Sequence, residues 1–183
     1  TLHRPESVGQ ASRLLADLGD EGAAYCGGTE LLLAMKLGLA SYDHLVDLKR
    51  VSGLRGITGL SSGGVGIGAA TTHREIETSA TLRAAYPELC ALISQVANVR
   101  VRSVGTLGGN LCAPPGSSSP RGDLQAALLA FGAEVPCPPP GGARTRMVGP
   151  VEGFGLFGKT GAAVWQMAGG MAEAADRVSS ETL

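Results

Sequence analysis

RSVGTLGGN, residues 102–110, ends in six positions that hold three glycines, a threonine and an asparagine. None of these side chains is a strong general acid, general base or metal ligand. Because glycine has no Cβ, a ligand can approach such a backbone closely, and successive N–H groups can converge on an anion. Taken alone, the stretch fits an ordinary glycine turn equally well, so both interpretations stay open at this point.

A second stretch, CGGTE at residues 26–30, has the same make-up. Each stretch sets a Gly-Gly pair beside a hydroxyl residue, Thr29 in one and Thr106 in the other. These hydroxyls can donate hydrogen bonds to phosphate oxygens, and the Asn110 amide can bind a ribityl or phosphate oxygen. Since the stretches lie far apart in the sequence, they would clamp a diphosphate from two separate elements.

The composition limits the partners that the 183-residue chain can bind. Its 15 basic and 16 acidic residues nearly balance, and only 4% of residues are aromatic, which argues against nucleic-acid or anionic-membrane binding. The scattered cysteines Cys26, Cys90, Cys112 and Cys137 form no C-x-x-C pair, which argues against a zinc ribbon or an iron–sulfur cluster. Reduced thiols, no long apolar run and no signal-peptide pattern predict a cytoplasmic protein without a membrane span.

Hydrophobic periodicity and capping signals predict alternating helices and strands. Residues 5–19 predict a helix that Ser7 and Gln10 cap and that ends at Gly19. A strand at 23–26 and a helix from the N-cap Thr29 through Leu37 follow, an order that aims backbone N–H groups at an anion. The other predictions are a strand at 44–48, a hairpin at 53–70 with its turn at 61–64, helices that begin at Thr72 and Pro87, a loop at 114–122, a helix running into a strand at 123–135, a linker at 136–150 and a weak helix at 161–178. The mixture indicates an α+β or mixed α/β fold.

Other residues that could carry chemistry have simpler interpretations. His73 falls in the first turn of a predicted helix, where we expect it to be solvated, and Cys26 has no accompanying base, so we expect it to pack. Arg100 and Arg102 alternate along a segment that we expect to be extended, facing solvent, phosphate or an acidic partner. VGIGAA, residues 65–70, lacks the third glycine of a dinucleotide fingerprint and fits a hairpin strand better.

Six stretches, in one order, resemble the FAD-binding subunit of molybdenum hydroxylases. That group includes xanthine dehydrogenase, carbon monoxide dehydrogenase through its medium subunit, and 4-hydroxybenzoyl-CoA reductase. The stretches are RPES…LLADLGD, YCGGTELLLAMKLG, HLVDLKRVSGLRGI, GVGIGAATTHREIE, VRSVGTLGGNLC and DLQAALLAFGAEV. They extend over residues 1–135, and the paired GGT and T-[LI]-GGN loops are more specific together than either loop alone.

The resemblance implies an α+β, two-lobed FAD-binding fold of the vanillyl-alcohol-oxidase (PCMH) type, with FAD between the lobes and its pyrophosphate on the glycine loops. It places the first lobe at residues 1–55, the second at 56–160 and a divergent tail at 161–183. It implies no catalytic residue and no metal ligand in the chain. The cofactor-binding residues that it implies are Ala24, Tyr25, Cys26, Gly27, Gly28, Thr29, Glu30, Leu31, Thr106, Leu107, Gly108, Gly109, Asn110, Cys112 and Asp123.

Three departures from the family pattern accompany the resemblance. The 114–122 segment is longer than usual, which weakens the match of Asp123 to the family's aspartate. FGLFGKT, residues 154–160, resembles the family's GKT ending, but the residues after it do not. The family's C-terminal domain has no counterpart, so we expect a fragment, a truncated product or a chain with a divergent tail.

The implied function is that of an oxidoreductase subunit that relays electrons from [2Fe–2S] clusters to FAD and on to NAD, a quinone or oxygen. The implied partners are a molybdenum-cofactor large subunit and a [2Fe–2S] small subunit, in a heterotrimer that is single or dimerised. Two alternatives stay open. One is a truncated, flavin-free interaction or assembly remnant, and the other is a protein that binds another anionic nucleotide through the same loops.

Overall fold

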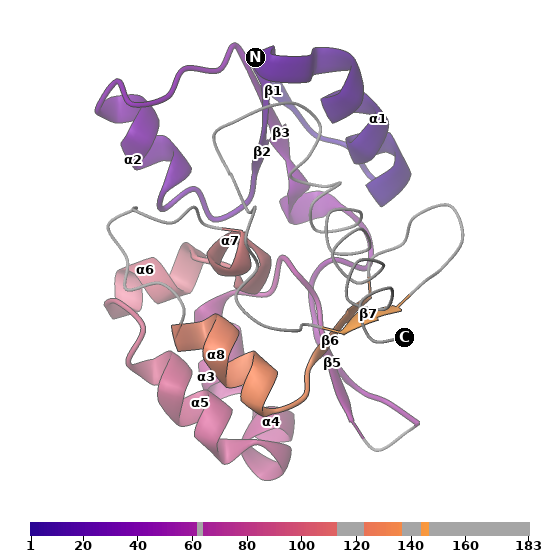
Figure 1. The fold of residues 1–183 in the computed structure, drawn as a ribbon, viewed down its shortest axis with the longest axis vertical. Helices are drawn as coiled ribbons and strands as arrows, with labels where there is room; N and C mark the ends of the chain where they lie inside the picture. The colour runs from indigo at the N-terminus through magenta and orange to yellow at the C-terminus, as the bar shows by residue number, and fades with distance from the viewer. Residues whose placement is uncertain (62–63, 113–122, 137–143, 147–183) are drawn as a thin grey trace, which may run out of the picture.

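Helices and short strands alternate in the computed structural model, which describes residues 1–61, 64–112, 123–136 and 144–146 (Figure 1). The strands are β1 (Leu2–His3), β2 (Gly22–Tyr25), β3 (His44–Asp47), β4 (Ile57–Gly59), β5 (Val65–Ile67), β6 (Glu134–Pro136) and β7 (Arg144–Arg146). The helices are α1 (Val8–Leu18), α2 (Leu31–Lys36), α3 (His73–Thr78), α4 (Ala80–Ala85), α5 (Pro87–Ser94), α6 (Val99–Val104), α7 (Leu107–Leu111) and α8 (Asp123–Ala130). This confirms the predicted mixture of helix and strand.

A three-stranded parallel sheet in the order β1-β3-β2 organises the N-terminal part, which lies at the top of Figure 1. Helix α1 begins as predicted, because the Ser7 hydroxyl accepts a hydrogen bond from the Gln10 backbone N–H at 3.2 Å, and it ends at Gly19. It packs on β2 and β3. The buried side chains of this first core are Ala11, Leu15, Val46, Leu48 and Val51.

A second core lies among the helices at the bottom of Figure 1. The β4–β5 hairpin is antiparallel, as predicted, and residues 57, 65 and 67 pack against this core. Helix α3 has the predicted capping box, in which the side chains of Thr72 and Glu75 each bind the other's backbone N–H. The buried members of the second core are Ile76, Leu82, Leu89, Cys90, Ile93, Leu107, Cys112, Leu124 and Leu128.

Four local predictions need correction. Arg100 and Arg102 lie in helix α6 rather than in an extended segment, because the Asn98 side chain accepts hydrogen bonds from two N–H groups and starts a helix there. Thr29 is not the N-cap of α2; Glu30 takes that position without a side-chain cap, so the helix begins one residue later than expected, at Leu31. The TLGGN segment is a short helix, α7, rather than a loop. Residues Arg144–Arg146 of the expected linker form β7, paired with β6.

Several predictions lie outside the described residues. These are the 114–122 loop, the GKT ending at 158–160 and the weak helix at 161–178. The domain boundaries at residues 55 and 160 stay predictions. In the part of the chain that the structure covers, no helix combines the length and the apolar character needed to cross a bilayer.

Candidate functional site

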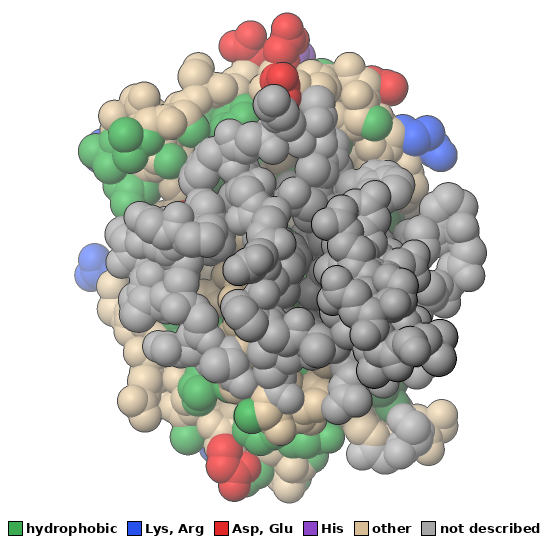
Figure 2. Space-filling view, viewed as in Figure 1, with side chains coloured by type: hydrophobic (Ala, Val, Ile, Leu, Met, Phe, Trp, Pro, Cys, Tyr) green, Lys and Arg blue, Asp and Glu red, His purple; other side chains and the backbone are tan. Residues whose placement is uncertain are grey.

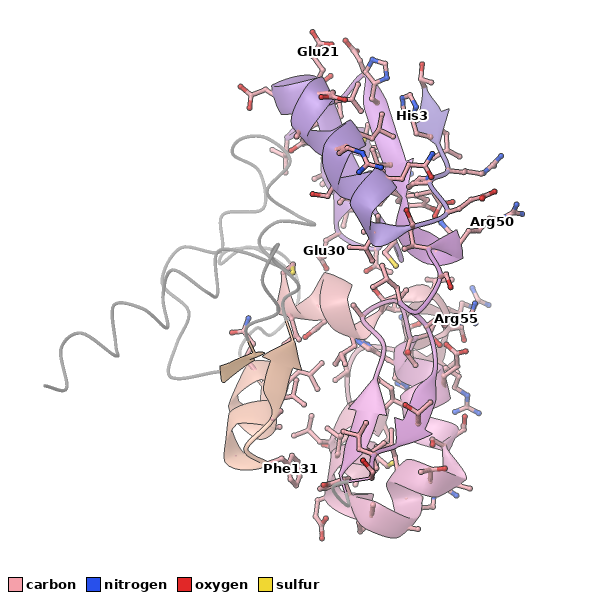
Figure 3. The ribbon with its side chains drawn as sticks, turned by 90° about the vertical axis from the view of Figure 1, so that its right-hand side faces the viewer. His3, Glu21, Glu30, Arg50, Arg55 and Phe131 are labelled. Carbon is pink, nitrogen blue, oxygen red and sulfur yellow. The ribbon has the colours of Figure 1, made fainter. Side chains whose placement is uncertain are left out.

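A cavity of about 100 Å³ lies where the N-terminal and helical parts of the chain meet. Figure 3 shows Glu30 at this level, between the α1 end of the molecule and the helices that contain the second core. The two glycine stretches, far apart in sequence, both line it. The predicted site residues in its wall are Ala24, Cys26, Gly27, Gly28, Thr29, Glu30, Leu31, Thr106, Gly108, Gly109, Asn110 and Cys112.

The first glycine stretch turns sharply between β2 and α2. Gly28 has φ +72°, a left-handed conformation that favours glycine, and a Cβ atom there would lie 2.5 Å from Cε2 of Tyr25. Gly27 packs against the end of α6, since a Cβ atom there would overlap the Val104 carbonyl oxygen and lie 2.9 Å from the Cα of Gly105. The two glycine stretches therefore meet backbone to backbone.

The second glycine stretch is fixed by the residues between β5 and α3. Leu107 donates its backbone N–H to the Thr71 carbonyl at 3.0 Å, and Gly108 donates to the Ala69 carbonyl at 2.8 Å. The Thr106 hydroxyl caps α7 by accepting from the Gly109 N–H at 3.2 Å. With its backbone held on one side, the stretch presents Gly109 and Asn110 to the cavity.

The Cys26 thiol lies in the wall between the two stretches. Burial raises the pKa of this thiol, against the opposing effects of the Thr106 hydroxyl and the Lys49 charge. Lys49 also stabilises the end of β2, because its ammonium group donates to the Cys26 carbonyl at 3.3 Å, pairs with Asp47 at 3.1 Å and lies 3.7 Å from the centre of the Tyr25 ring. Cys26 is therefore a protonated, half-buried thiol at neutral pH.

His73 also lines the cavity, and the expectation that it is solvated is wrong. Its side chain is 3% exposed, because the N-terminus of α3 is covered by the turn between α6 and α7, where the Gly105 carbonyl accepts the His73 backbone N–H at 2.9 Å. Burial lowers the pKa of His73, more than the adjacent Thr106 backbone raises it, so the ring is neutral at neutral pH. Neither ring nitrogen has a hydrogen-bond partner among the described residues.

Three of the predicted site residues do not line the cavity. Tyr25 lies behind the first stretch, under Lys49, and Leu107 is buried in the second core. Asp123 begins α8, and its side chain is outside the described part of the structure. Tyr25 and Leu107 thus support the glycine stretches from behind, and Asp123 stays a predicted contact.

Apart from Gly105, which directly precedes the predicted residues of the second stretch, five lining residues were not predicted as part of the site: Leu48, His73, Val96, Ala97 and Val101. Ala97 is the one non-glycine residue with a positive φ, +48°, in the described part of the chain, and it precedes the Asn98 cap. No sequence signal marks these positions, because the apolar residues follow an ordinary helical pattern and His73 occupies an ordinary first-turn position. Only the tertiary structure brings these residues together around the cavity.

The donors around the cavity suit binding better than catalysis. The backbone of the first glycine stretch, the Thr29 hydroxyl and the Asn110 side-chain amide can offer hydrogen bonds to an oxygen-rich anionic group. The backbone N–H groups of residues 107–110 in the second stretch already bind Thr71, Ala69 and Thr106, so this stretch contributes close approach and side chains rather than amide donors. Over the residues that the structure describes, no group of three or more His, Cys, Asp and Glu side chains is arranged to hold a metal ion. The volume is small, so the cavity can enclose only part of a large ligand.

In comparison with protein families, residues 1–150 match the model described as the FAD binding domain in molybdopterin dehydrogenase. Among curated proteins, the chain is 37% identical to the carbon monoxide dehydrogenase medium chain of Hydrogenophaga pseudoflava over 84% of its length and 51% of that protein. It is 32% identical to the xanthine dehydrogenase FAD-binding subunit of Escherichia coli, over 84% of its length and 50% of that subunit. The chain thus spans about half the length of these relatives.

Solved structures give the same result. Carbon monoxide dehydrogenase from Hydrogenophaga pseudoflava superposes with a TM-score of 0.70 at 35% identity, covering 80% of this chain and 49% of the matched one. The reconstituted enzyme from Oligotropha carboxidovorans also gives 0.70, at 30% identity, covering 87% of this chain and 57% of the matched one. The backbone described above is therefore similar to that of known dehydrogenase subunits.

Proposed function

The chain belongs to the family of FAD-binding domains in molybdopterin dehydrogenases, and from that premise we propose that it is the flavin-binding part of a molybdenum-containing oxidoreductase. The observation that carries the proposal is the meeting of the two glycine stretches in the wall of one cavity. FAD is the cofactor of this family. The chain spans about half the length of its relatives. The activity, substrate and partners of the whole enzyme are therefore part of the proposal.

The residues in the cavity fit a dinucleotide. A pyrophosphate needs several donors that converge at short range, which the first glycine stretch and the Thr29 and Asn110 side chains can provide. Bulkier side chains at the glycines of either stretch would block this approach. The cavity also holds a buried His73 whose ring nitrogens lack partners among the described residues, so a polar ligand has a group to bind there. Both features favour an oxygen-rich ligand over an apolar one.

We propose that the cavity holds the pyrophosphate of FAD and that the rest of the cofactor extends beyond the enclosed space. Residues 26–30 bind it from one side, and Thr106, Gly108, Gly109 and Asn110 bind it from the other. Asp123 is kept as a proposed contact to a cofactor hydroxyl. The arrangement supports a two-lobed fold of the vanillyl-alcohol-oxidase type, with FAD between the two hydrophobic cores.

When bound, FAD supplies electron transfer between [2Fe–2S] clusters and an acceptor such as NAD, a quinone or oxygen. The chain's own residues bind and orient the cofactor, and none of them is proposed to act as an acid, a base or a nucleophile. The proposed partners are a molybdenum-cofactor large subunit and a [2Fe–2S] small subunit. Their presence agrees with the names of the relatives, which are subunits or chains of dehydrogenases.

The surface of the chain supports its place in a larger assembly. Figure 2 shows hydrophobic side chains gathered over α2. The exposed leucines in and after this helix are Leu32, Leu33, Leu37 and Leu39, which are 42% to 76% exposed. A cluster of large apolar side chains at a surface is typical of a protein–protein contact.

The proposal is tested by the colour and the partners of the purified protein. We expect yellow protein whose flavin absorbance is bleached by dithionite, and which co-purifies with molybdenum and iron–sulfur subunits when all are expressed together. A colourless protein that rejects added FAD but still binds those subunits would support the flavin-free remnant. Tighter binding of FMN or NAD than of FAD in a thermal-shift comparison would favour a different nucleotide ligand.

A further inference from the structure

The His73 side chain is the most deeply buried polar group in the cavity wall that the fold leaves unused. It is 3% exposed, and although the Thr106 backbone lies near enough to raise the pKa of the ring, neither ring nitrogen makes a hydrogen bond of normal geometry with the described residues. A buried polar group without a partner costs roughly 1–3 kcal/mol, so native proteins rarely keep one without a reason. The reason must lie outside the contacts that the described residues make.

The fold around His73 does not need an imidazole. Helix α3 is started by the side chains of Thr72 and Glu75, and His73 contributes only its backbone N–H, which binds the Gly105 carbonyl at 2.9 Å. A leucine or phenylalanine could fill the same space without a buried polar atom. The imidazole ring is thus not needed for the start of α3 or for the turn at Gly105 that covers it.

The ring faces the second glycine stretch. Its Nδ1 atom lies 3.8 Å from the position that a Cβ atom on Gly105 would take, and Gly105, Thr106 and His73 all line the cavity. A neutral imidazole has one N–H donor and one acceptor nitrogen. The ribityl–pyrophosphate chain of FAD carries oxygens that accept from such a donor, and the ribityl hydroxyls can also donate to the other nitrogen.

We propose that the His73 ring donates a hydrogen bond to an oxygen of the ribityl–pyrophosphate chain of FAD, and so adds a third binding element to the two glycine stretches. The inference rests on the proposed function, because it takes FAD as the occupant of the cavity. It assigns a binding role to a residue outside both glycine stretches. It also explains why an unpaired imidazole is kept in the wall.

Substitution of His73 should change stability and cofactor binding in opposite directions. In His73→Leu, we expect the cofactor-free full chain to melt at the same temperature or higher, since two unpaired polar atoms are removed. The same variant should bind FAD about 10- to 100-fold more weakly, because a hydrogen bond to a phosphate or hydroxyl is lost. His73→Gln, which keeps a donor, should recover part of that affinity.

His44→Leu is the matched control. His44 is half-buried in β3, where its Nδ1 lies 2.9 Å from Nε2 of His3, and neither residue lines the cavity. This variant should bind FAD within about twofold of the natural chain. Unchanged FAD affinity in His73→Leu would overturn the inference, and so would a lower melting temperature of the cofactor-free variant, because the ring would then have a structural partner.

A second measurement does not depend on the variant's folding. The chain has only three histidines, so ¹⁵N-histidine labelling gives a short spectrum. We expect FAD to shift the ring signals of His73 and to leave those of His3 and His44 in place. Unmoved His73 signals at saturating FAD would overturn the inference. The proposed function would survive that result if Gly109→Val still abolished FAD binding, whereas a natural chain that binds no FAD would overturn both.

Discussion

Gly27 packs directly against the backbone of Val104, so closely that a Cβ atom on the glycine would overlap the Val104 carbonyl oxygen. This contact joins the turn after β2 to the end of α6, and hence the first glycine stretch to the residues that lead into the second. It positions the two stretches on one cavity. The absence of a side chain at Gly27 is thus needed for assembly of the site.

Replacement of Gly27 by alanine should separate the two stretches. The added methyl group meets backbone atoms of Val104 and Gly105, which cannot move as a side chain would, so we expect a loss of about 1–3 kcal/mol in the free energy of unfolding. FAD affinity should fall with it. Gly9→Ala is the control, since its Cβ atom would lie 3.8 Å from the Arg13 guanidinium and should stabilise α1 by about 0.5–1 kcal/mol. A Gly27→Ala variant as stable as the natural chain contradicts the contact.

The Thr106 hydroxyl should matter more than the shape of its side chain. It caps α7 through the Gly109 N–H, so Thr106→Val, which keeps the volume, should cost about 1 kcal/mol of stability and weaken FAD binding. Thr106→Ser keeps the oxygen and should retain most of both. Chemical denaturation and FAD titration of the pair test this. Equal affinity in the valine and serine variants would show that the hydroxyl has no part in the site.

The alkylation rate of Cys26 should report whether the cavity is occupied. Since burial raises its thiol pKa, the reactive thiolate is scarce at neutral pH, and alkylation should be slower than for a free cysteine and should accelerate as the pH rises. Saturating FAD should slow alkylation of the Cys26 peptide further, as measured by mass spectrometry. The Gly109→Val variant, in which FAD should not bind, should show no protection. Equal rates with and without FAD in the natural chain would remove Cys26 from the site.

The acid stability of the chain should depend on Glu77. Its carboxylate lies 3.0 Å from both Arg74 and Arg102, and these contacts lower its pKa below the ordinary value. A glutamate carboxyl has a pKa of roughly 4.3 in the unfolded chain, and a lowered pKa in the folded chain stabilises the folded state at any pH above that value. This contribution is lost as the pH falls through the lower pKa of the folded state. Glu77→Gln should therefore lower the melting temperature near neutral pH and flatten its fall in acid.

The control for Glu77 is the same change at Glu21. This exposed residue ends the turn after α1 and projects outward at the top of Figure 3. Glu21→Gln should follow the melting curve of the natural chain at every pH. If the curve of Glu77→Gln also runs parallel to that of the natural chain from pH 3 to pH 7, the arginine contacts do not contribute to stability.

The sequence was sufficient to predict those elements whose signals are local. The Thr72–Glu75 capping box, the Ser7 cap and the β4–β5 hairpin each depend on residues within a few positions of one another, and each prediction is confirmed. Helix α6 was missed because its start depends on the Asn98 side chain, a cap that the alternation of arginines and valines obscured. The α7 helix was missed because two glycines disfavour a helix, and it is held by the Thr106 cap and by hydrogen bonds to the carbonyls of Ala69 and Thr71.

The site could be predicted only in part, for a similar reason. Both glycine stretches are visible in the sequence, and the structure brings them together. The burial of His73 is not visible, because it depends on how the turn at Gly105 covers the start of α3. Solvent exposure of a first-turn residue is set by tertiary packing, which no local pattern reports.

A fluorescence titration with FAD tests most directly whether the cofactor binds between the two glycine stretches. Gly109 is exposed in the cavity wall, and a Cβ atom there would lie 2.9 Å from the capping Thr106 oxygen, so Gly109→Val both fills the space and disturbs the cap. Gly59→Val is the matched control, because a Cβ atom on that β4 residue meets no atom within 4 Å.

We expect the natural chain and Gly59→Val to bind FAD saturably with one site each. Gly109→Val should keep the circular dichroism of a folded protein while its affinity falls by about 100-fold or more. Full FAD binding by folded Gly109→Val would contradict the claim.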